Sequence, residues 1–266
     1  MRLLRALRSV VEKVVPDRIL APLMAERSRR HQVQYLRNEG FIALADTFIA
    51  HNGLEVKHGP FRGMRYTLPA ARHRIVIPKL LGCYERELHG VVTQVQQGDY
   101  DVIVDVGCAE GYYSTGLALT TKAKVIAFDA EQIELAHARE MARENRVEDR
   151  IEFRSWCNAN ALIEIARAYR RPFLLSDCEG YEVSLFTPEV IAELRHADLL
   201  IELHGDAKPI FMLRFAQTHR VEIICFNGDN RGDYEQLKTL PPDKRAQAVS
   251  ELRSAQEWLW AQHISD

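Results

Sequence analysis

The sequence predicts an α/β protein built on a doubly wound, mostly parallel sheet. Short runs rich in valine, isoleucine and leucine alternate with helical segments from residue 100 onward, as expected for strands buried on both faces of a parallel sheet. The first run, D-V-I-V-D-V-G, also ends in a glycine-containing turn, G-C-A-E-G, that leads into a helix. A strand, a glycine turn and a helix in this order open a nucleotide-binding βαβ unit.

Composition and charge narrow the class of protein. The chain has 266 residues, 47% hydrophobic and 27% charged, enough to bury the core of one large domain without disulfides. The formal net charge of -2 gives no electrostatic reason to expect nucleic acid as a partner. The five cysteines form no C-x-x-C pair, and no apolar run reaches the roughly 18 residues of a membrane helix. We therefore expect a soluble, cytoplasmic protein with reduced thiols.

Three regions follow one another along the chain. Residues 1–52 are expected to form a helical extension, residues 53–98 a hairpin and a helix that lead into the core, and residues 99–266 the α/β domain. The first 25 residues place leucines and valines on one helical face and most basic side chains elsewhere. Such an amphipathic helix either packs on the domain or contacts a membrane surface or a partner. The sequence leaves both open, together with the oligomeric state.

Each element has its own sequence signal. Short apolar runs predict the strands, and apolar residues spaced three and four apart predict the helices between them. Turn residues around Gly53, Gly59 and Gly63 predict the hairpin. The strands are expected at 101–107, 123–129, 150–156, 172–177, 197–204, 221–226 and 257–263, and the helices at 78–97, 112–122, 131–146, 159–169, 182–195, 208–219 and 242–254.

The glycine turn after the first strand indicates a nucleotide-like cofactor. Glycines let the backbone approach a ligand closely, and the helix that follows presents unpaired N–H groups. Asp129 ends the next strand, where a carboxylate can accept hydrogen bonds from a ribose diol. The turn reads D-x-G-x-x-x-G and not G-x-G-x-x-G, and the carboxylates of Asp105 and Glu110 would repel a pyrophosphate. A ligand with a ribose and an amino group but no phosphate fits better.

S-adenosylmethionine is such a ligand, and the segment V-D-V-G-C-A-E-G-Y-Y-S resembles the first motif of the class I S-adenosylmethionine-dependent methyltransferases. The resemblance implies a Rossmann-like methyltransferase domain of about seven strands, mostly parallel with the last one antiparallel, behind the helical N-terminal extension. Two other classes stay open. An NAD-dependent oxidoreductase would need the absent G-x-G-x-x-G turn, and a non-catalytic adenosyl-binding protein would need only the turn. A sheet whose turn glycines serve packing alone is the remaining alternative.

Further motifs resemble those of one methyltransferase family. D-C-E-G-Y-E at residues 177–182, I-E-L-H at residues 201–204 and Y-E-R-E at residues 84–87 are similar to elements of the FkbM family. The similarity covers residues 80–226 and assigns nothing to the N-terminal 50 residues or to the segment 227–256. It implies O-methylation of a hydroxyl on a sugar, glycoconjugate or natural product, and hence a small-molecule or glycan acceptor.

The polar residues that follow the strands are the candidate catalytic residues, because ligands bind at the carboxyl ends of the strands in this class of sheet. His204 is the first candidate for a general base, since an acceptor hydroxyl must lose a proton and imidazole titrates near neutral pH. Asp177 and Glu179 are the second candidates. A purely structural role at the strand end is the alternative for His204. These residues and Glu202 could also hold a divalent cation, but no spacing rule singles out a metal site and none is predicted.

The cofactor S-adenosylmethionine is expected to contact the glycine turn, the ends of the second to fourth strands and the Y-E-R-E element. Residues of the first two groups are expected to bind the ribose, adenine and amino groups, whereas the last is included through the family resemblance. The expected cofactor-binding residues are Asp105, Gly107, Cys108, Ala109, Gly111, Asp129, Ala130, Asn158, Asp177 and Glu85.

Overall fold

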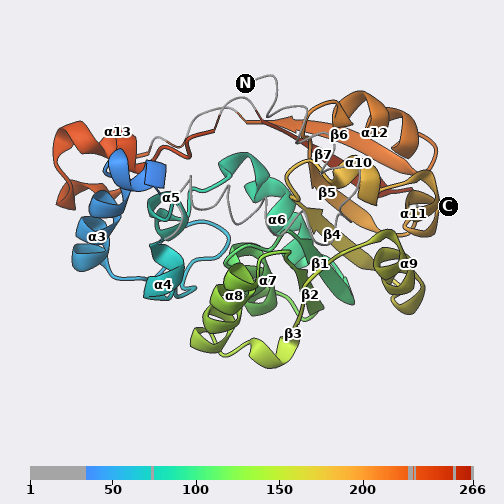
Figure 1. Ribbon diagram of the computed structural model, residues 1–266, viewed down its shortest axis with the longest axis horizontal. Helices are drawn as coiled ribbons and strands as arrows, with labels where there is room; N and C mark the ends of the chain where they lie inside the picture. Colours follow the sequence, from blue (N-terminus) through green and yellow to red (C-terminus); the bar gives the residue numbers. More distant parts are fainter. Residues whose placement is uncertain (1–33, 73–74, 227–229, 231, 254–255, 265–266) are drawn as a thin grey trace, which may run out of the picture.

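The computed structural model describes residues 34–72, 75–226, 230, 232–253 and 256–264. Its strands are β1 Val102–Val106, β2 Lys124–Phe128, β3 Ile151–Arg154, β4 Pro172–Ser176, β5 Asp198–Glu202, β6 His219–Cys225 and β7 Glu257–His263. They form one sheet in the order β3-β2-β1-β4-β5-β7-β6 (Figure 1). Neighbouring strands pair in parallel from β3 to β5, and β7 lies antiparallel between β5 and β6. The predicted doubly wound α/β class and the antiparallel last strand are confirmed.

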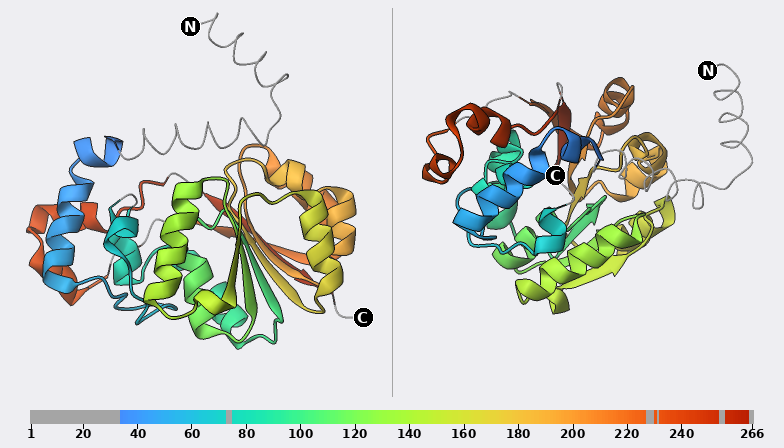
Figure 2. Two further views of the ribbon diagram at one scale, coloured as in Figure 1. Left: turned by 60° about the horizontal axis from the view of Figure 1, so that its bottom comes forward. Right: turned by 60° about the vertical axis from the view of Figure 1, so that its left-hand side comes forward.

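Helices cover both faces of this sheet (Figures 1 and 2). One face carries α6 His89–Gln97, α7 Tyr112–Thr120 and α8 Gln132–Glu144, and the other carries α9 Ala159–Ala168, α10 Glu182–Leu185, α11 Pro188–Glu193 and α12 Ala207–Phe215. Successive side chains of a strand point to opposite faces, so Ile103 joins the apolar cluster under α7 while Val104 joins the one under α9. The central strands are buried on both sides, which explains why they read as continuous apolar runs.

Segments from the two ends of the chain pack together beside the sheet. Helix α3 (Phe41–Asn52) lies next to the 3-10 helix η3 (Glu235–Thr239) and the short helix α13 (Arg245–Ala248) (Figure 1). Asn52 Nδ2 donates a hydrogen bond to Thr239 Oγ1 at 3.0 Å. The predicted helical extension is thus present over its described part, and it packs on a segment to which the sequence assigned no role.

The predicted hairpin is present, but the helix expected over 78–97 is interrupted. In the hairpin the Tyr66 N–H donates to the Leu54 carbonyl at 2.7 Å. The helix stops because Gly82 takes φ +77, and a Cβ at that position would lie 1.9 Å from the carbonyl oxygen of His58 in the hairpin. The hairpin backbone therefore fixes the turn at Gly82. The pieces are α5 Ile77–Leu81, the 3-10 helix η1 Arg86–Leu88 and α6.

Two more helices are shorter than predicted. The helix expected over 182–195 divides into α10 and α11, because Thr187 caps α11 with its side chain and Pro188 opens it. The helix expected over 242–254 reduces to the 3-10 helix η4 (Pro242–Lys244) and α13, and residues 251–253 have no regular secondary structure. Leu252 in this stretch adopts the left-handed conformation, with φ +56.

None of the described helices combines the length and the apolar character that crossing a bilayer requires. The amphipathic helix expected within the first 25 residues lies outside the described residues.

Candidate active site

The glycine turn between β1 and α7 is tightly packed against the end of β4. Gly107 has φ +87, and a Cβ at this position would lie 1.8 Å from the carbonyl oxygen of Asp177. Gly111 has φ +90 and is the N-cap residue of α7. Ala109, which lies between these two glycines, also adopts the left-handed conformation, with φ +47. The turn therefore keeps a glycine-type backbone at three positions, and it brings the β1 and β4 strand ends into contact.

Asp129 holds this turn from the end of β2. Its Oδ2 accepts a hydrogen bond from the Ala109 N–H at 2.8 Å, and its Oδ1 accepts one from the Glu131 N–H at 2.8 Å. The side chain is half-buried at the position that the sequence predicted for a ribose-binding carboxylate.

Asp105 lies within the sheet and not on the surface of the turn. It is 1% exposed and accepts a hydrogen bond from the Ser114 hydroxyl of α7. Burial raises the pKa of Asp105 to about 7. Asp105 was predicted to bind the cofactor. In the structure its side chain connects β1 to α7 through the hydrogen bond from Ser114.

The raised pKa of Asp105 predicts a pH-dependent stability effect. A carboxyl group whose pKa is raised by folding stabilises the fold while it is protonated; that contribution is complete below about pH 4 and is lost as the pH rises through about 7. Asparagine keeps the acceptor for Ser114 and cannot ionise. We expect Asp105→Asn to be about 4 kcal/mol more stable than the wild type at about pH 8, with the gain vanishing near pH 4. Urea denaturation at both pH values measures this.

The exposed carboxylate of Asp99, just before β1, supplies the control for that measurement. Asp99→Asn removes one negative charge without changing a buried group, so its stability should stay within about 0.5 kcal/mol of the wild type at both pH values. Equal gains for Asp99→Asn and Asp105→Asn would attribute the effect to net charge and contradict the prediction.

Glu110 connects the turn to the N-terminal part of the chain. Its carboxylate pairs with the Lys79 ammonium and accepts a hydrogen bond from the Tyr66 hydroxyl at 3.1 Å. Lys79 also lies over the ring of Tyr84, 4.6 Å from its centroid. Both charged side chains are buried. Glu110 therefore connects the turn to buried side chains of the N-terminal part. The sequence did not indicate its partner, because Lys79 lies in a different predicted element.

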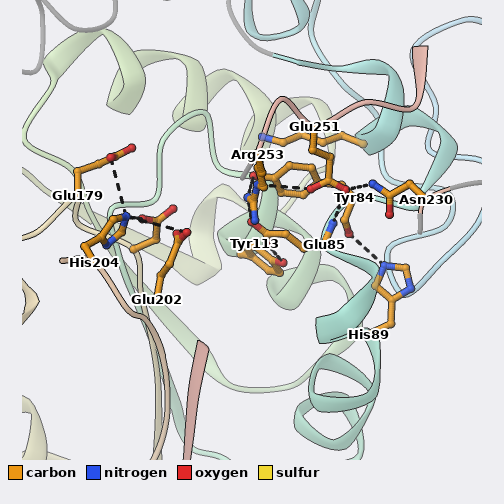
Figure 3. A network of polar contacts seen from close by, with 12 residues as sticks. Tyr84, Glu85, His89, Tyr113, Glu179, Glu202, His204, Asn230, Glu251 and Arg253 are labelled. Atoms are coloured by element: carbon orange, nitrogen blue, oxygen red, sulfur yellow. Dashed lines mark hydrogen bonds and ion pairs between the residues drawn. The ribbon is translucent and has the colours of Figure 1, made fainter. Parts of the chain in front are cut away.

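Five polar side chains gather where β4 and β5 end, with His204 at their centre (Figure 3). Its Nδ1–H donates a hydrogen bond to Glu182 Oε1 at 3.0 Å. Its Nε2 faces three other carboxylates, with Asp177 Oδ1 at 3.8 Å, Glu179 Oε2 at 4.0 Å and Glu202 Oε1 at 4.0 Å. Glu182 and Glu202 are buried, whereas the Glu179 side chain is 86% exposed. The fold thus brings the three predicted catalytic residues together and adds two buried carboxylates.

Burial and mutual repulsion set the ionisation of this cluster. Burial raises the pKa of Asp177 to about 6, and burial together with the neighbouring Asp177 raises the pKa of Glu202 to about 10. The hydrogen bond to Glu182 raises the pKa of His204. Burial opposes the ionisation of Glu182, but the hydrogen bonds from His204 and from the backbone outweigh it and lower the pKa of Glu182. The Glu182 carboxylate therefore holds the His204 ring in place through Nδ1, whether the imidazole is charged or neutral.

Glu85, predicted as a cofactor contact, belongs to a second, buried network (Figure 3). Its carboxylate accepts hydrogen bonds from the Tyr113 hydroxyl and the Arg253 guanidinium, and its N–H donates to Glu251 Oε1 at 3.1 Å. Arg253 also donates to the Tyr84 hydroxyl at 2.5 Å. Glu85 is 1% exposed, so its carboxylate is committed to protein partners. Neither Glu251 nor Arg253 was singled out by the sequence, because both lie more than 160 residues away along the chain.

The remaining predicted cofactor contacts lie around the strand ends in different environments. Asn158 caps α9 through its side-chain oxygen, Cys108 is buried and Ala130 is half-buried. An aromatic pair that the sequence did not indicate, Trp156 after β3 and Tyr181 after β4, lies close by with ring centroids 5.2 Å apart. Both rings are partly exposed.

Comparisons with known proteins place one match on this part of the chain. Residues 98–165, which run from the end of α6 into α9 and include the glycine turn and Asp129, match the family model described as a methyltransferase domain. No curated protein matches the sequence.

Several solved structures are similar in fold. Precorrin 8W decarboxylase from Methanobacterium thermoautotrophicum aligns with 67% of this chain and 89% of its own, at 15% identity and a TM-score of 0.48. Precorrin-6y C5,15-methyltransferase from Geobacter metallireducens aligns with 68% of this chain and 90% of its own, at 12% identity and a TM-score of 0.46. The METTL16 methyltransferase domain aligns with 67% of this chain and 66% of its own, at 13% identity and a TM-score of 0.45.

Proposed function

We propose that this chain is an S-adenosylmethionine-dependent methyltransferase that methylates a hydroxyl group. One observation carries the proposal: the Gly107 turn touches the Asp177 backbone, so a cofactor held on the turn lies next to the His204 cluster. The methyltransferase-domain match over residues 98–165 covers the turn and supports the same reading. The glycine turn and the His204 cluster therefore lie next to each other at the carboxyl-terminal edge of the sheet.

The charges around the turn favour this cofactor over a dinucleotide. Asp129 and Asp177 follow β2 and β4, the strands on either side of β1, and no arginine or lysine is among the residues expected to bind the cofactor. A pyrophosphate would be repelled there, whereas a sulfonium and an amino group carry positive charge. The residues present therefore fit S-adenosylmethionine, with Asp129 holding the ribose and the backbone of the turn approaching the rest of the ligand.

The chain's own residues then account for acceptor activation. S-adenosylmethionine supplies, when bound, a methyl group on a good leaving group, so alignment and exclusion of water provide much of the acceleration. The acceptor hydroxyl must lose its proton, and His204 Nε2 is the atom that takes it. Glu182 holds the other ring nitrogen as a donor and so fixes the tautomer whose Nε2 carries the lone pair. Asp177 and the exposed Glu179 orient the acceptor at the rim.

The acceptor class is proposed from the motifs at the strand ends. D-C-E-G-Y-E and I-E-L-H, whose resemblance to the FkbM family is described above, supply Asp177, Glu182, Glu202 and His204. Carboxylates of this kind recognise hydroxyl groups well, which supports a sugar, glycoconjugate or natural-product acceptor. The net charge of -2 supports no nucleic-acid substrate.

Cofactor binding tests the proposed function without knowledge of the acceptor. Thermal unfolding is measured with S-adenosylhomocysteine, S-adenosylmethionine, NAD and NADP, each at about 100 times its dissociation constant, as determined by titration calorimetry. The adenosyl ligands should raise the melting temperature by about 5 to 10 °C, equivalent to about 2.7 kcal/mol. Asp129→Ala removes the proposed ribose ligand and should weaken S-adenosylhomocysteine binding at least tenfold, whereas the exposed control Asp99→Ala should not.

A shift with NAD or NADP alone would overturn the methyltransferase proposal in favour of an oxidoreductase. Tight S-adenosylhomocysteine binding that is equal in Asp129→Ala and Asp99→Ala would remove Asp129 from the cofactor site.

A further inference from the structure

Three side chains at the ends of β4 and β5 converge as metal ligands do. Asp177 follows β4, Glu182 begins α10 and His204 follows β5. Each offers one ligand atom, and these atoms all lie within 4.8 Å of one another. Ligands bound to one small divalent ion at about 2.1 Å are separated by roughly 3 Å when adjacent and roughly 4 Å when opposite. Separations of up to 4.8 Å exceed the bound distances by less than about 1 Å, so small side-chain movements would bring the three ligand atoms onto one ion.

Buried oxygen atoms without donors point into the same place. Glu202 is 2% exposed, and its Oε1 lies 4.0 Å from His204 Nε2 yet accepts no hydrogen bond from any described residue. Oε2 of Glu182, which is fully buried, and Oδ1 of Asp177 also lack a donor. A buried polar atom without a partner destabilises a fold by about 1 to 3 kcal/mol. Without a cation, the Asp177 and Glu202 carboxyl groups share a proton. A cation would replace that proton and satisfy all three oxygens at once.

The carboxyl groups around His204 outnumber the cationic side chains near them. Asp177, Glu179, Glu182 and Glu202 surround one imidazole. The nearby Arg253 guanidinium is engaged by Glu85 and Glu251. Carboxylates at this density repel one another unless protons or a cation intervene.

We propose that Asp177, Glu182 and His204 bind a divalent cation, with the Glu202 carboxylate as a further ligand. One imidazole with carboxylate oxygens suits Mn²⁺ and related first-row ions better than Ca²⁺, which takes six to eight oxygen ligands. The inference concerns the site at which the proposed function places the acceptor, but cation binding itself does not depend on methyl transfer. Cation binding uses the imidazole as a ligand, so His204 acts as a base only in protein without the ion.

Titration of the full chain with Mn²⁺ alone tests the inference, because free Mn²⁺ is counted directly by electron paramagnetic resonance. We expect one saturable Mn²⁺ per wild-type chain. Asp177→Asn, Glu202→Gln and His204→Gln should each weaken binding at least tenfold. Asp206→Asn, which removes an exposed carboxylate two residues after His204, should bind as the wild type does.

Melting temperatures in EDTA separate lost ligands from lost folding. Asp177→Asn removes a repelling charge, and Glu202→Gln replaces a carboxyl group that is already protonated near neutral pH, so both should melt at or above the wild-type temperature in EDTA and lose the rise that Mn²⁺ gives the wild type. The inference is overturned if the wild type binds no Mn²⁺, or if all variants bind it equally. S-adenosylhomocysteine titrations in EDTA distinguish the two proposals. If the protein binds S-adenosylhomocysteine but no Mn²⁺, only the cation proposal is overturned. If it binds Mn²⁺ but no S-adenosylhomocysteine, only the methyltransferase proposal is overturned.

Discussion

Replacing Gly107 with alanine is expected to lower the free energy of unfolding by about 4 kcal/mol and to abolish S-adenosylhomocysteine binding. Two physical effects add at this position. A φ of +87 strains any residue that has a Cβ, by about 1 to 2 kcal/mol. The added Cβ would also lie 1.8 Å from the Asp177 carbonyl oxygen, so the ends of β1 and β4 must separate, at a further cost of about 1 to 3 kcal/mol. Urea denaturation and calorimetry measure the two consequences.

Gly63 provides a matched control for this substitution. It has φ +91, nearly the same backbone conformation, but nothing lies within 4 Å of its ideal Cβ. Gly63→Ala should therefore show only the backbone strain, about 1 to 2 kcal/mol, and should keep cofactor affinity. If the two variants lose equal stability, the close approach of the β1 turn to β4 has no energetic weight, and the adjacency on which the proposed function rests is put in doubt.

Replacing Arg253 with methionine is expected to destabilise the protein by about 3 to 5 kcal/mol, because it leaves Glu85 and Glu251 buried without their cation. The Arg253 side chain is only 10% exposed, so solvent cannot take over the role of the guanidinium. Methionine keeps most of the side-chain volume, which makes the lost charge the main difference. Urea denaturation at neutral pH measures the effect.

Neutralising the partner should rescue that variant. The double variant Arg253→Met/Glu85→Gln carries no unpaired charge at position 85, so it should recover at least half of the lost stability. Glu85→Gln alone should itself be destabilised, since it leaves the guanidinium without its carboxylate. Purely additive losses in the three variants would show that Arg253 and Glu85 do not act as a pair.

The strands could be predicted from the sequence because their signal is local. β7 is a clear case, since E-W-L-W-A-Q-H was expected at 257–263 and the strand occupies Glu257–His263. The strand ends then predicted which polar residues meet, and Asp177, Glu179 and His204 do lie together. This second success follows from a property of parallel sheets, because the carboxyl ends of parallel strands share one edge.

What the sequence could not predict depends on contacts between distant segments. The break at Gly82 requires the carbonyl of His58 in the preceding hairpin, and no periodicity within 78–97 contains that information. Glu85 was expected at the cofactor, and its partner Arg253 lies in a stretch expected to be helical. The division at Thr187-Pro188 is different, because a capping threonine before a proline is a local signal that the apolar stripe of 182–195 concealed.

The place of β7 in the sheet sets an order of events during synthesis of the chain. β7 separates β5 from β6, so until residues 257–263 have left the ribosome β5 has an unpaired edge and β6 has no neighbour in the sheet. Glu251 and Arg253 immediately precede β7 in the sequence. Glu85 therefore also gains its buried partners only late in synthesis. A nascent chain can assemble the cofactor-binding strands β1 to β4 early, whereas the residues around His204 acquire their final surroundings only after β7 has been inserted.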